Sequence, residues 1–284
     1  MPVAQLISPQ ALNERQAQPG LIILDCRFAL EDPDYGRCSY AEGHIAGAQF
    51  ADLERDLSGP VVKGVTGRHP LPDAHTLLER LRTWGVNADS DVVLYDDGPG
   101  AFAARAWWLL TWLGKRDGVF ILDGGLKAWH AAGFPLSLDA VALPRGDFDG
   151  KPDKHLLLDA EHLQKHLGDP GLTLIDARAL PRFRGEVEPI DPVAGHIPGA
   201  QCAAFSENLD STGRFLPAEQ LKQRFAEKLA GRSPEELVAY CGSGVTACHN
   251  LFALALAGYP LGKLYAGSWS EWINDPARGI ATGD

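Results

Sequence analysis

"LTLIDAR" at residues 172–178 and "AGHIPGAQC" at residues 194–202 each have an earlier counterpart in the same chain. The counterparts are "LIILDCR" at 21–27 and "EGHIAGAQF" at 42–50. Two further matches follow in the same order: "DVVLYDDGPGA" at 91–101 with "ELVAYCGSGVT" at 236–246, and "GGLKAW" at 124–129 with "GSWSEW" at 267–272. Repeated similarity in a constant order indicates two copies of one structural unit.

Each copy alternates short β-rich runs with helical stretches. The expected strands are Leu21–Leu24, Val92–Tyr95, Leu172–Ile175 and Leu237–Tyr240. We expect a helix from about Phe102 to Leu113 and its counterpart from about Val245 to Ala257, each followed by a glycine suited to a helix C-terminus. The pattern predicts an α/β fold of two tandem domains, each a mainly parallel sheet flanked by helices.

A segment rich in proline, glycine and charge separates the copies. It reads "DAVALPRGDFDGKPDK" and covers residues 139–154. Such a composition is typical of a linker. We therefore expect an N-terminal domain at 1–138 and a C-terminal domain at 155–284.

Composition narrows the class of partner. The 284 residues are 45% hydrophobic and carry a formal net charge of −11, which argues against a nucleic acid or an anionic membrane. No apolar run reaches the roughly 20 residues of a membrane helix, and the start of the chain does not resemble a secretory signal. The five cysteines form no CxxC pair, which fits a reducing compartment. We expect a cytoplasmic protein with a small-molecule or protein partner.

One cysteine stands where a predicted strand ends and a predicted helix begins. Cys241 opens the loop "CGSGVT", in which Gly242 and Gly244 permit a tight turn and Ser243 and Thr246 supply hydroxyl groups. Backbone N–H groups of such a loop, together with the start of a helix, stabilise an anion. The loop therefore predicts a reactive thiolate at Cys241.

Other interpretations of the cysteines carry less weight. A free cysteine at a strand end is often a small buried hydrophobe, and this is how we interpret Cys248 on its apolar helix. Cys26, Cys38 and Cys202 have no comparable loop. A cysteine phosphatase would need an arginine six positions after the nucleophile, where this chain has Ala247. His162 and His166 have the spacing of a metal pair but no third ligand, so we predict no metal site.

The tandem copies, the two "GHI(A/P)GA" segments and the "CGSGVTA" loop resemble the two-domain rhodanese superfamily, and within it the mercaptopyruvate sulfurtransferases. The resemblance covers nearly the whole chain. It implies that only the C-terminal domain is catalytic, because Asp96 stands in the first copy where Cys241 stands in the second. It also implies a persulfide on Cys241 that needs no cofactor.

The resemblance assigns further residues by position. Arg182 in "RFRG" matches an arginine that binds the substrate carboxylate, while Ile190 replaces a second arginine that the family usually carries. Gly242, Ser243, Gly244, Val245 and Thr246 form the substrate loop. His44 matches a histidine that acts with an aspartate and the loop serine; Asp34 fits that aspartate best by spacing, with Asp32 next. The copy of His44 at His196 equally favours a structural role for both histidines.

These residues predict a sulfurtransferase that takes sulfur from 3-mercaptopyruvate and passes it to a thiol or cyanide. The resemblance implies thioredoxin or a small thiol as the acceptor. Because Ile190 brings no charge, thiosulfate remains an alternative donor. A protein that only carries a persulfide to a partner is the alternative from another functional class.

Overall fold

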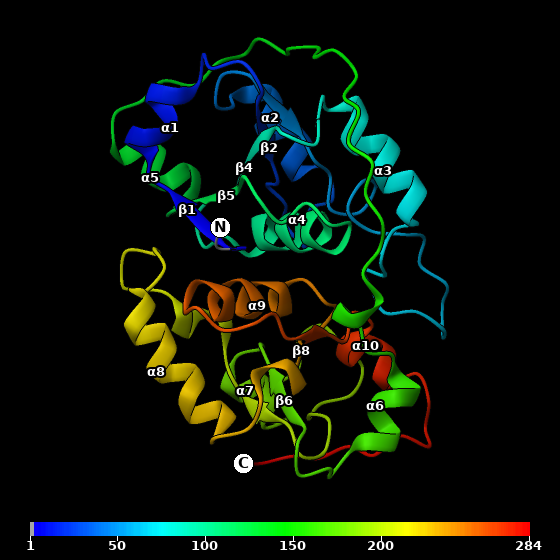
Figure 1. Ribbon diagram of the computed structural model, residues 1–284. Helices are drawn as coiled ribbons and strands as arrows, with labels where there is room; N and C mark the ends of the chain where they lie inside the picture. The colour runs from blue at the N-terminus through cyan, green and yellow to red at the C-terminus, as the bar shows by residue number, and fades with distance from the viewer. Residues whose placement is uncertain (1–2) are drawn as a thin grey trace. The chain divides into compact units, whose positions relative to one another are not determined.

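The computed structural model describes residues 3–284 (Figure 1). Its internal contacts divide the chain into two compact units. Unit 1 holds the residues up to Gly59, Pro72–Asp153 and Ser211–Phe215, and unit 2 holds Pro60–Leu71, Lys154–Asp210 and Leu216–Asp284. Unit 1 thus extends through most of the predicted linker at 139–154, and the sequence pattern did not assign 60–71 to the second unit.

Unit 1 is built on a five-stranded sheet whose strands all run parallel, in the order β1-β5-β4-β2-β3. Its elements are β1 (Gln5–Ile7), α1 (Pro9–Arg15), β2 (Leu21–Asp25), α2 (Tyr35–Glu42), β3 (Ala48–Phe50), α3 (Ala74–Thr83), β4 (Asp91–Tyr95), α4 (Ala101–Trp112), β5 (Val119–Leu122) and α5 (Gly125–Ala131). Strands buried on both faces explain why β2 and β4 read as continuous apolar runs.

Unit 2 repeats this plan with four parallel strands in the order β7-β6-β8-β9. Its helices and strands are α6 (Ala160–His166), β6 (Thr173–Asp176), α7 (Leu180–Phe183), β7 (Gln201–Cys202), α8 (Ala218–Leu229), β8 (Leu237–Tyr240), α9 (Thr246–Leu256), β9 (Lys263–Leu264) and α10 (Ser268–Trp272). Short 3-10 turns lie at Lys154–Leu156, Phe205–Asn208 and Pro234–Glu236. The predicted α/β fold with two mainly parallel sheets is confirmed.

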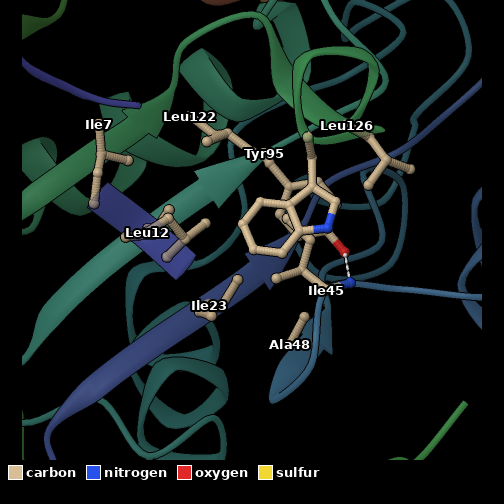
Figure 2. Packing of buried hydrophobic residues seen from close by; sticks show 10 residues of the cluster. Ile7, Leu12, Ile23, Ile45, Ala48, Tyr95, Leu122 and Leu126 are labelled. Carbon is tan, nitrogen blue, oxygen red and sulfur yellow. Dashed lines mark hydrogen bonds between the residues drawn. The ribbon is translucent and has the colours of Figure 1, made fainter. Parts of the chain in front are cut away.

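Apolar side chains from strands and helices form a core in each unit. In unit 1, Ile7, Ile23 and Tyr95 from the sheet pack with Leu12 of α1 and Leu126 of α5 (Figure 2). In unit 2 the corresponding cluster draws on α6, α10 and the strands, and includes Leu163, Val238, Tyr240, Trp269 and Trp272. These cores hold the ends of β4 and β8 in place.

A buried polar network explains the repeated "D-x-R" and "GHI" segments. The Tyr95 hydroxyl donates to Asp25 Oδ2 at 2.6 Å. It also accepts the backbone N–H of Ile45 at 3.2 Å (Figure 2). Arg27 pairs with Asp25 and donates to Gly43 O at 2.8 Å.

Unit 2 has the same arrangement. Arg178 pairs with Asp176 and donates to Gly195 O at 2.7 Å, and Tyr240 accepts the N–H of Ile197 at 3.1 Å. The buried aspartate of each unit is thus neutralised by an arginine, which makes its burial tolerable. The network ties the strand that precedes each loop to the neighbouring "GHI" turn.

No helix in the described part of the chain is long and apolar enough to cross a membrane.

Candidate active site

The Cys241 loop joins β8 to α9 in unit 2. Cys241 is buried, with 2% of its surface exposed. Its Sγ accepts the backbone N–H of Gly244 at 3.1 Å and that of Ser243 at 3.5 Å. Two backbone donors are thus aimed at one sulfur atom, in the loop that leads into the 11-residue helix α9.

Both loop glycines have close neighbours, but only Gly244 has a positive φ. Gly244 has φ +79°, and a Cβ there would lie 2.4 Å from Ala266 O. A Cβ on Gly242 would lie 2.8 Å from Nη2 of Arg68. Any side chain at 244 would therefore open the turn, whereas one at 242 would displace the flexible end of the Arg68 side chain.

The start of α10 anchors the loop from the other side. Ser268, a buried residue with φ +56°, accepts the N–H of Cys241 at 3.1 Å and donates its hydroxyl to Tyr265 O at 2.9 Å. Trp269 N donates to Cys241 O, and Ser270 N donates to Gly242 O, at 3.0 and 2.9 Å. These hydrogen bonds give the "GSWSEW" segment a structural role, because the Ser268 hydroxyl accepts the backbone N–H of Cys241.

A histidine adjoins the loop serine. His69 Nδ1 lies 2.8 Å from Ser243 Oγ, and both residues are buried. His69 comes from the segment Pro60–Leu71, which packs within unit 2. The Ser243 hydroxyl lies two residues after the cysteine and is hydrogen-bonded to the His69 imidazole, an arrangement suited to moving a proton beside the sulfur.

Two arginines lie next to the loop. Arg182 of α7 donates from Nε and Nη2 to Glu188 and from Nη2 to Asp191 Oδ2 at 3.3 Å. Arg68 pairs through Nη1 with Asp191 Oδ1. The place of a Cβ on Gly242 is 2.8 Å from Arg68 Nη2 and 3.6 Å from Arg182 Nη2, so both cations border the residue that follows Cys241.

The two carboxylates of this cluster differ in their electrostatics. Burial raises the pKa of Asp191 above its ordinary value, against the attraction of Arg68. Burial also acts on Glu188, but hydrogen bonds from Arg182 and from the backbone outweigh it, so that the pKa of Glu188 is lowered. Glu188 is therefore the stronger carboxylate partner of Arg182, and Asp191 is the weaker one.

A cavity of about 680 Å³ also lies in unit 2, lined mostly by apolar surface from residues such as Val65, Leu158 and Tyr265. Neither Cys241 nor the two arginines line it. The hydrogen-bond donors around Cys241, rather than this cavity, define the candidate active site.

A family model described as "Rhodanese-like domain" matches the chain twice, at residues 8–132 and 159–275. The chain belongs to the rhodanese family. Within this family it is 70% identical over all 284 residues to a protein of the same length from Pseudomonas aeruginosa, "Probable 3-mercaptopyruvate sulfurtransferase", with 100% of each chain covered.

Other rhodanese-family relatives are more distant. "Thiosulfate sulfurtransferase" from Gallus gallus is 35% identical, covering 93% of this chain and 90% of its own. The crystal structure of SseA from Escherichia coli, described as a 3-mercaptopyruvate sulfotransferase, matches with a TM-score of 0.80 at 34% identity, covering 94% of this chain and 100% of its own. Relatives named for both donors thus share the whole fold.

The structure gathers most of the predicted site residues of this rhodanese. Cys241, Gly242, Ser243, Gly244 and Arg182 lie together, Val245 immediately precedes α9, and Thr246 is its first residue. Their roles in catalysis stay predictions. Ile190 is 40% exposed, and its backbone N–H donates to Glu188.

The predicted relay through His44 gains no support from its contacts. His44 lies in unit 1, with Nδ1 2.8 Å from Tyr40 O and Nε2 3.2 Å from Asp139 O, and its ring stacks on Tyr40. His196 repeats this in unit 2, stacking on Phe183 with Nδ1 2.7 Å from Phe183 O. Such matching contacts favour the structural alternative for both histidines.

Asp34 caps the start of α2 without a side-chain hydrogen bond to the helix, and its N–H donates to Asp32 Oδ1. Within residues 3–284 neither aspartate forms a hydrogen bond or an ion pair with a histidine or with Ser243, and the histidine beside Ser243 is His69.

Sequence reasoning missed His69 and Arg68. Both belong to "GRHPLP" at 67–72, which lies outside the four repeated segments and so has no counterpart in the second copy. The only local signal was two adjacent basic residues between a glycine and a proline.

Proposed function

We propose that the chain is a sulfurtransferase that moves sulfane sulfur from 3-mercaptopyruvate, through a persulfide on Cys241, to a thiol or cyanide acceptor. The observation that carries the proposal is Cys241 Sγ, held by two backbone N–H groups at the start of α9 and bordered by Arg68 and Arg182. The 70% identity to a relative named for this donor supports the same assignment.

In the first half-reaction the Cys241 thiolate attacks the donor sulfur. A sulfur–sulfur bond forms, the C3–S bond breaks, and its electron pair leaves on C3 as the enolate of pyruvate. The proton of the donor thiol balances this charge and completes pyruvate. His69 and Ser243, 2.8 Å apart, are placed to pass that proton beside the sulfur.

In the second half-reaction an acceptor thiolate or cyanide attacks the outer sulfur. The new bond to the acceptor forms as the sulfur–sulfur bond breaks, and Cys241 returns as a thiolate. The N–H groups of Ser243 and Gly244 stabilise that leaving thiolate. Thioredoxin or a small thiol is the acceptor we propose, and no cofactor enters the cycle.

We also place the protein in the cytoplasm. All five cysteines are free thiols, as expected in a reducing compartment.

Thiosulfate is the second candidate donor, since Ile190 brings no charge and the Gallus gallus relative is named for thiosulfate. A persulfide carrier without turnover is the alternative from another class. Steady-state assays with 3-mercaptopyruvate, thiosulfate and a thiol acceptor separate the three. We expect ping-pong kinetics, a protein one sulfur atom heavier after donor alone, and higher kcat/KM with 3-mercaptopyruvate. Preference for thiosulfate, or a persulfide that forms without turnover, contradicts the proposal.

A further inference from the structure

Arg68 reaches the candidate active site from a segment that is tied down at both sides. Its backbone N–H donates to Ser270 Oγ at 3.1 Å, and Thr66 O accepts Asn274 Nδ2 at 3.1 Å. Gly67 approaches Gly267 so closely that a Cβ would lie 2.4 Å from the carbonyl oxygen. The segment is thus bonded to α10, the same element that anchors the Cys241 loop, which holds Arg68 in a constant position beside that loop.

The guanidinium group of Arg68 has an N–H donor without a hydrogen-bond partner in the described residues. Nη1 pairs with Asp191, whereas Nε is buried and has no hydrogen-bond partner in residues 3–284. Nη2 points to the Cα of Gly242, as its 2.8 Å distance from a Cβ built there indicates. A buried donor without a partner is costly, so an arrangement of this kind is expected where a ligand supplies the acceptor.

Arg182 presents a matching donor from the opposite segment. Its Nη1 makes no hydrogen bond in the described residues and lies 3.8 Å from the same Cβ position. One carboxylate already bridges the pair, since Asp191 Oδ1 meets Arg68 and Asp191 Oδ2 meets Arg182. The spacing of the two guanidinium groups therefore suits a carboxylate.

We propose that Arg68 is the second carboxylate-binding residue of the active site. Together with Arg182 it supplies the pair of cations that the uncharged Ile190 cannot complete. The inference rests on the proposed function and specifies its substrate class, a donor whose sulfur lies a short distance from a carboxylate. The donor carboxylate takes the unused donors of Arg68 and Arg182 above Gly242, while Asp191 keeps both arginines oriented. Arg68 is thus a specificity-determining residue that acts on binding and leaves the thiolate unchanged.

The first test measures charge recognition without turnover. Iodoacetate carries a carboxylate and iodoacetamide does not, so the ratio of their alkylation rates at Cys241 reports a cation beside the sulfur. Arg68→Gln should lower this ratio about tenfold, the scale of one charge-assisted contact, and Arg68→Lys should retain most of it. Arg232→Gln removes an exposed arginine of unit 2 and serves as the control with the same change in net charge.

A second measurement separates binding from folding. Arg68→Gln leaves Asp191 with one arginine, so the double variant Arg68→Gln with Asp191→Asn restores the charge balance. Both variants should raise KM for 3-mercaptopyruvate about tenfold with a smaller change in kcat. Adding Ile190→Arg to Arg68→Gln should lower KM again.

The outcomes distinguish this inference from the proposed function. An alkylation ratio that stays within twofold of the wild type in both Arg68→Gln variants overturns the role of Arg68, even where sulfur transfer continues. A wild-type Cys241 that forms no persulfide overturns the proposed function whatever the ratio. A lower ratio with retained iodoacetamide reactivity supports Arg68 as the second cation.

Discussion

The loops that follow β4 and β8 are the same structure holding different groups. In unit 1 the carboxylate of Asp96 accepts four backbone N–H groups, from Gly98, Gly100, Phe102 and Ala103, at 2.9–3.3 Å. In unit 2 the sulfur of Cys241 accepts two, from Ser243 and Gly244. Both loops end where a helix begins, at α4 and at α9.

The difference between Asp96 and Cys241 shows how one fold can hold a structural loop in unit 1 and a reactive loop in unit 2. In both units the loop and the start of the following helix supply a site for an anion. A carboxylate fills that site permanently, because both oxygens use its donors. A single thiolate sulfur engages fewer donors and can accept another sulfur atom. The second loop is also bordered by a histidine and two arginines of its own unit.

Replacing the nucleophile should have the largest effect. Cys241→Ser should lower sulfur transfer on the order of 10⁴-fold or more, because the persulfide cannot form. Persulfide detection by mass and steady-state turnover check this. Cys38→Ser, which alters an exposed thiol, is the matched control and should keep wild-type activity.

The comparison of the loops sharpens this prediction. Asp96→Cys in the Cys241→Ser background should restore no turnover, since His69, Arg68 and Arg182 belong to the unit of the Cys241 loop. Restored activity would mean that a loop alone suffices for sulfur transfer.

The His69–Ser243 pair should come next. His69→Ala and Ser243→Ala should each lower kcat about 100-fold through loss of proton transfer. The double variant should be little worse than either single one, because the two residues act as a unit. Steady-state kcat measurements check this, with His130→Ala as a control at an exposed histidine. Additive losses would show that the two side chains act separately.

Arg182→Ala should lower kcat/KM for 3-mercaptopyruvate about 10- to 100-fold, the scale of one charge-assisted contact of about 1.5–3 kcal/mol. Thiosulfate should respond less, because it lacks a carboxylate. Arg184→Ala removes a neighbouring arginine that pairs with Asp284 and is the matched control. Unchanged turnover of 3-mercaptopyruvate would exclude Arg182 from donor binding.

The loop of unit 1 that surrounds the Asp96 carboxylate should matter for stability rather than for activity. Asp96→Asn replaces one of two carboxylate oxygens that accept N–H groups by an NH2 group that cannot accept, and should lower the free energy of unfolding by about 1–3 kcal/mol. Urea unfolding measures this, with Asp89→Asn as a control at an exposed aspartate. An equally stable variant would mean that the loop needs no anion.

The pH dependence of the Asp96→Asn stability change follows from the direction in which folding shifts the pKa of Asp96. Burial raises the pKa of Asp96 above its ordinary value, although the four backbone N–H groups oppose the rise. Between the unfolded pKa of about 4 and the raised pKa of the folded state, the folded state binds more protons than the unfolded state, so the contribution of Asp96 to stability falls as pH rises through that window. The advantage of the wild type over Asp96→Asn should therefore shrink with rising pH. An advantage that grows with pH would mean that the N–H groups outweigh burial.

Much of the molecule was predictable because its signals are local. The apolar runs of β2, β4, β6 and β8 and the glycines that end α4 and α9 depend on neighbouring residues, and the repeats aligned the copies. The assignment of His44 followed position in a family motif. In the structure the contacts of that histidine match those of its copy at His196.

By itself the sequence determined two copies of one α/β unit, a carboxylate in the first loop and a thiol in the second, because each of these lies in a contiguous repeated segment. The tertiary structure alone decided which cations and which histidine join Cys241. His69 and Ser243 are 174 positions apart, and Arg68 and Asp191 are 123 apart. Contacts over such separations depend on the path of residues 60–71 across unit 2, which close backbone approaches and hydrogen bonds to α10 set and which no local pattern encodes.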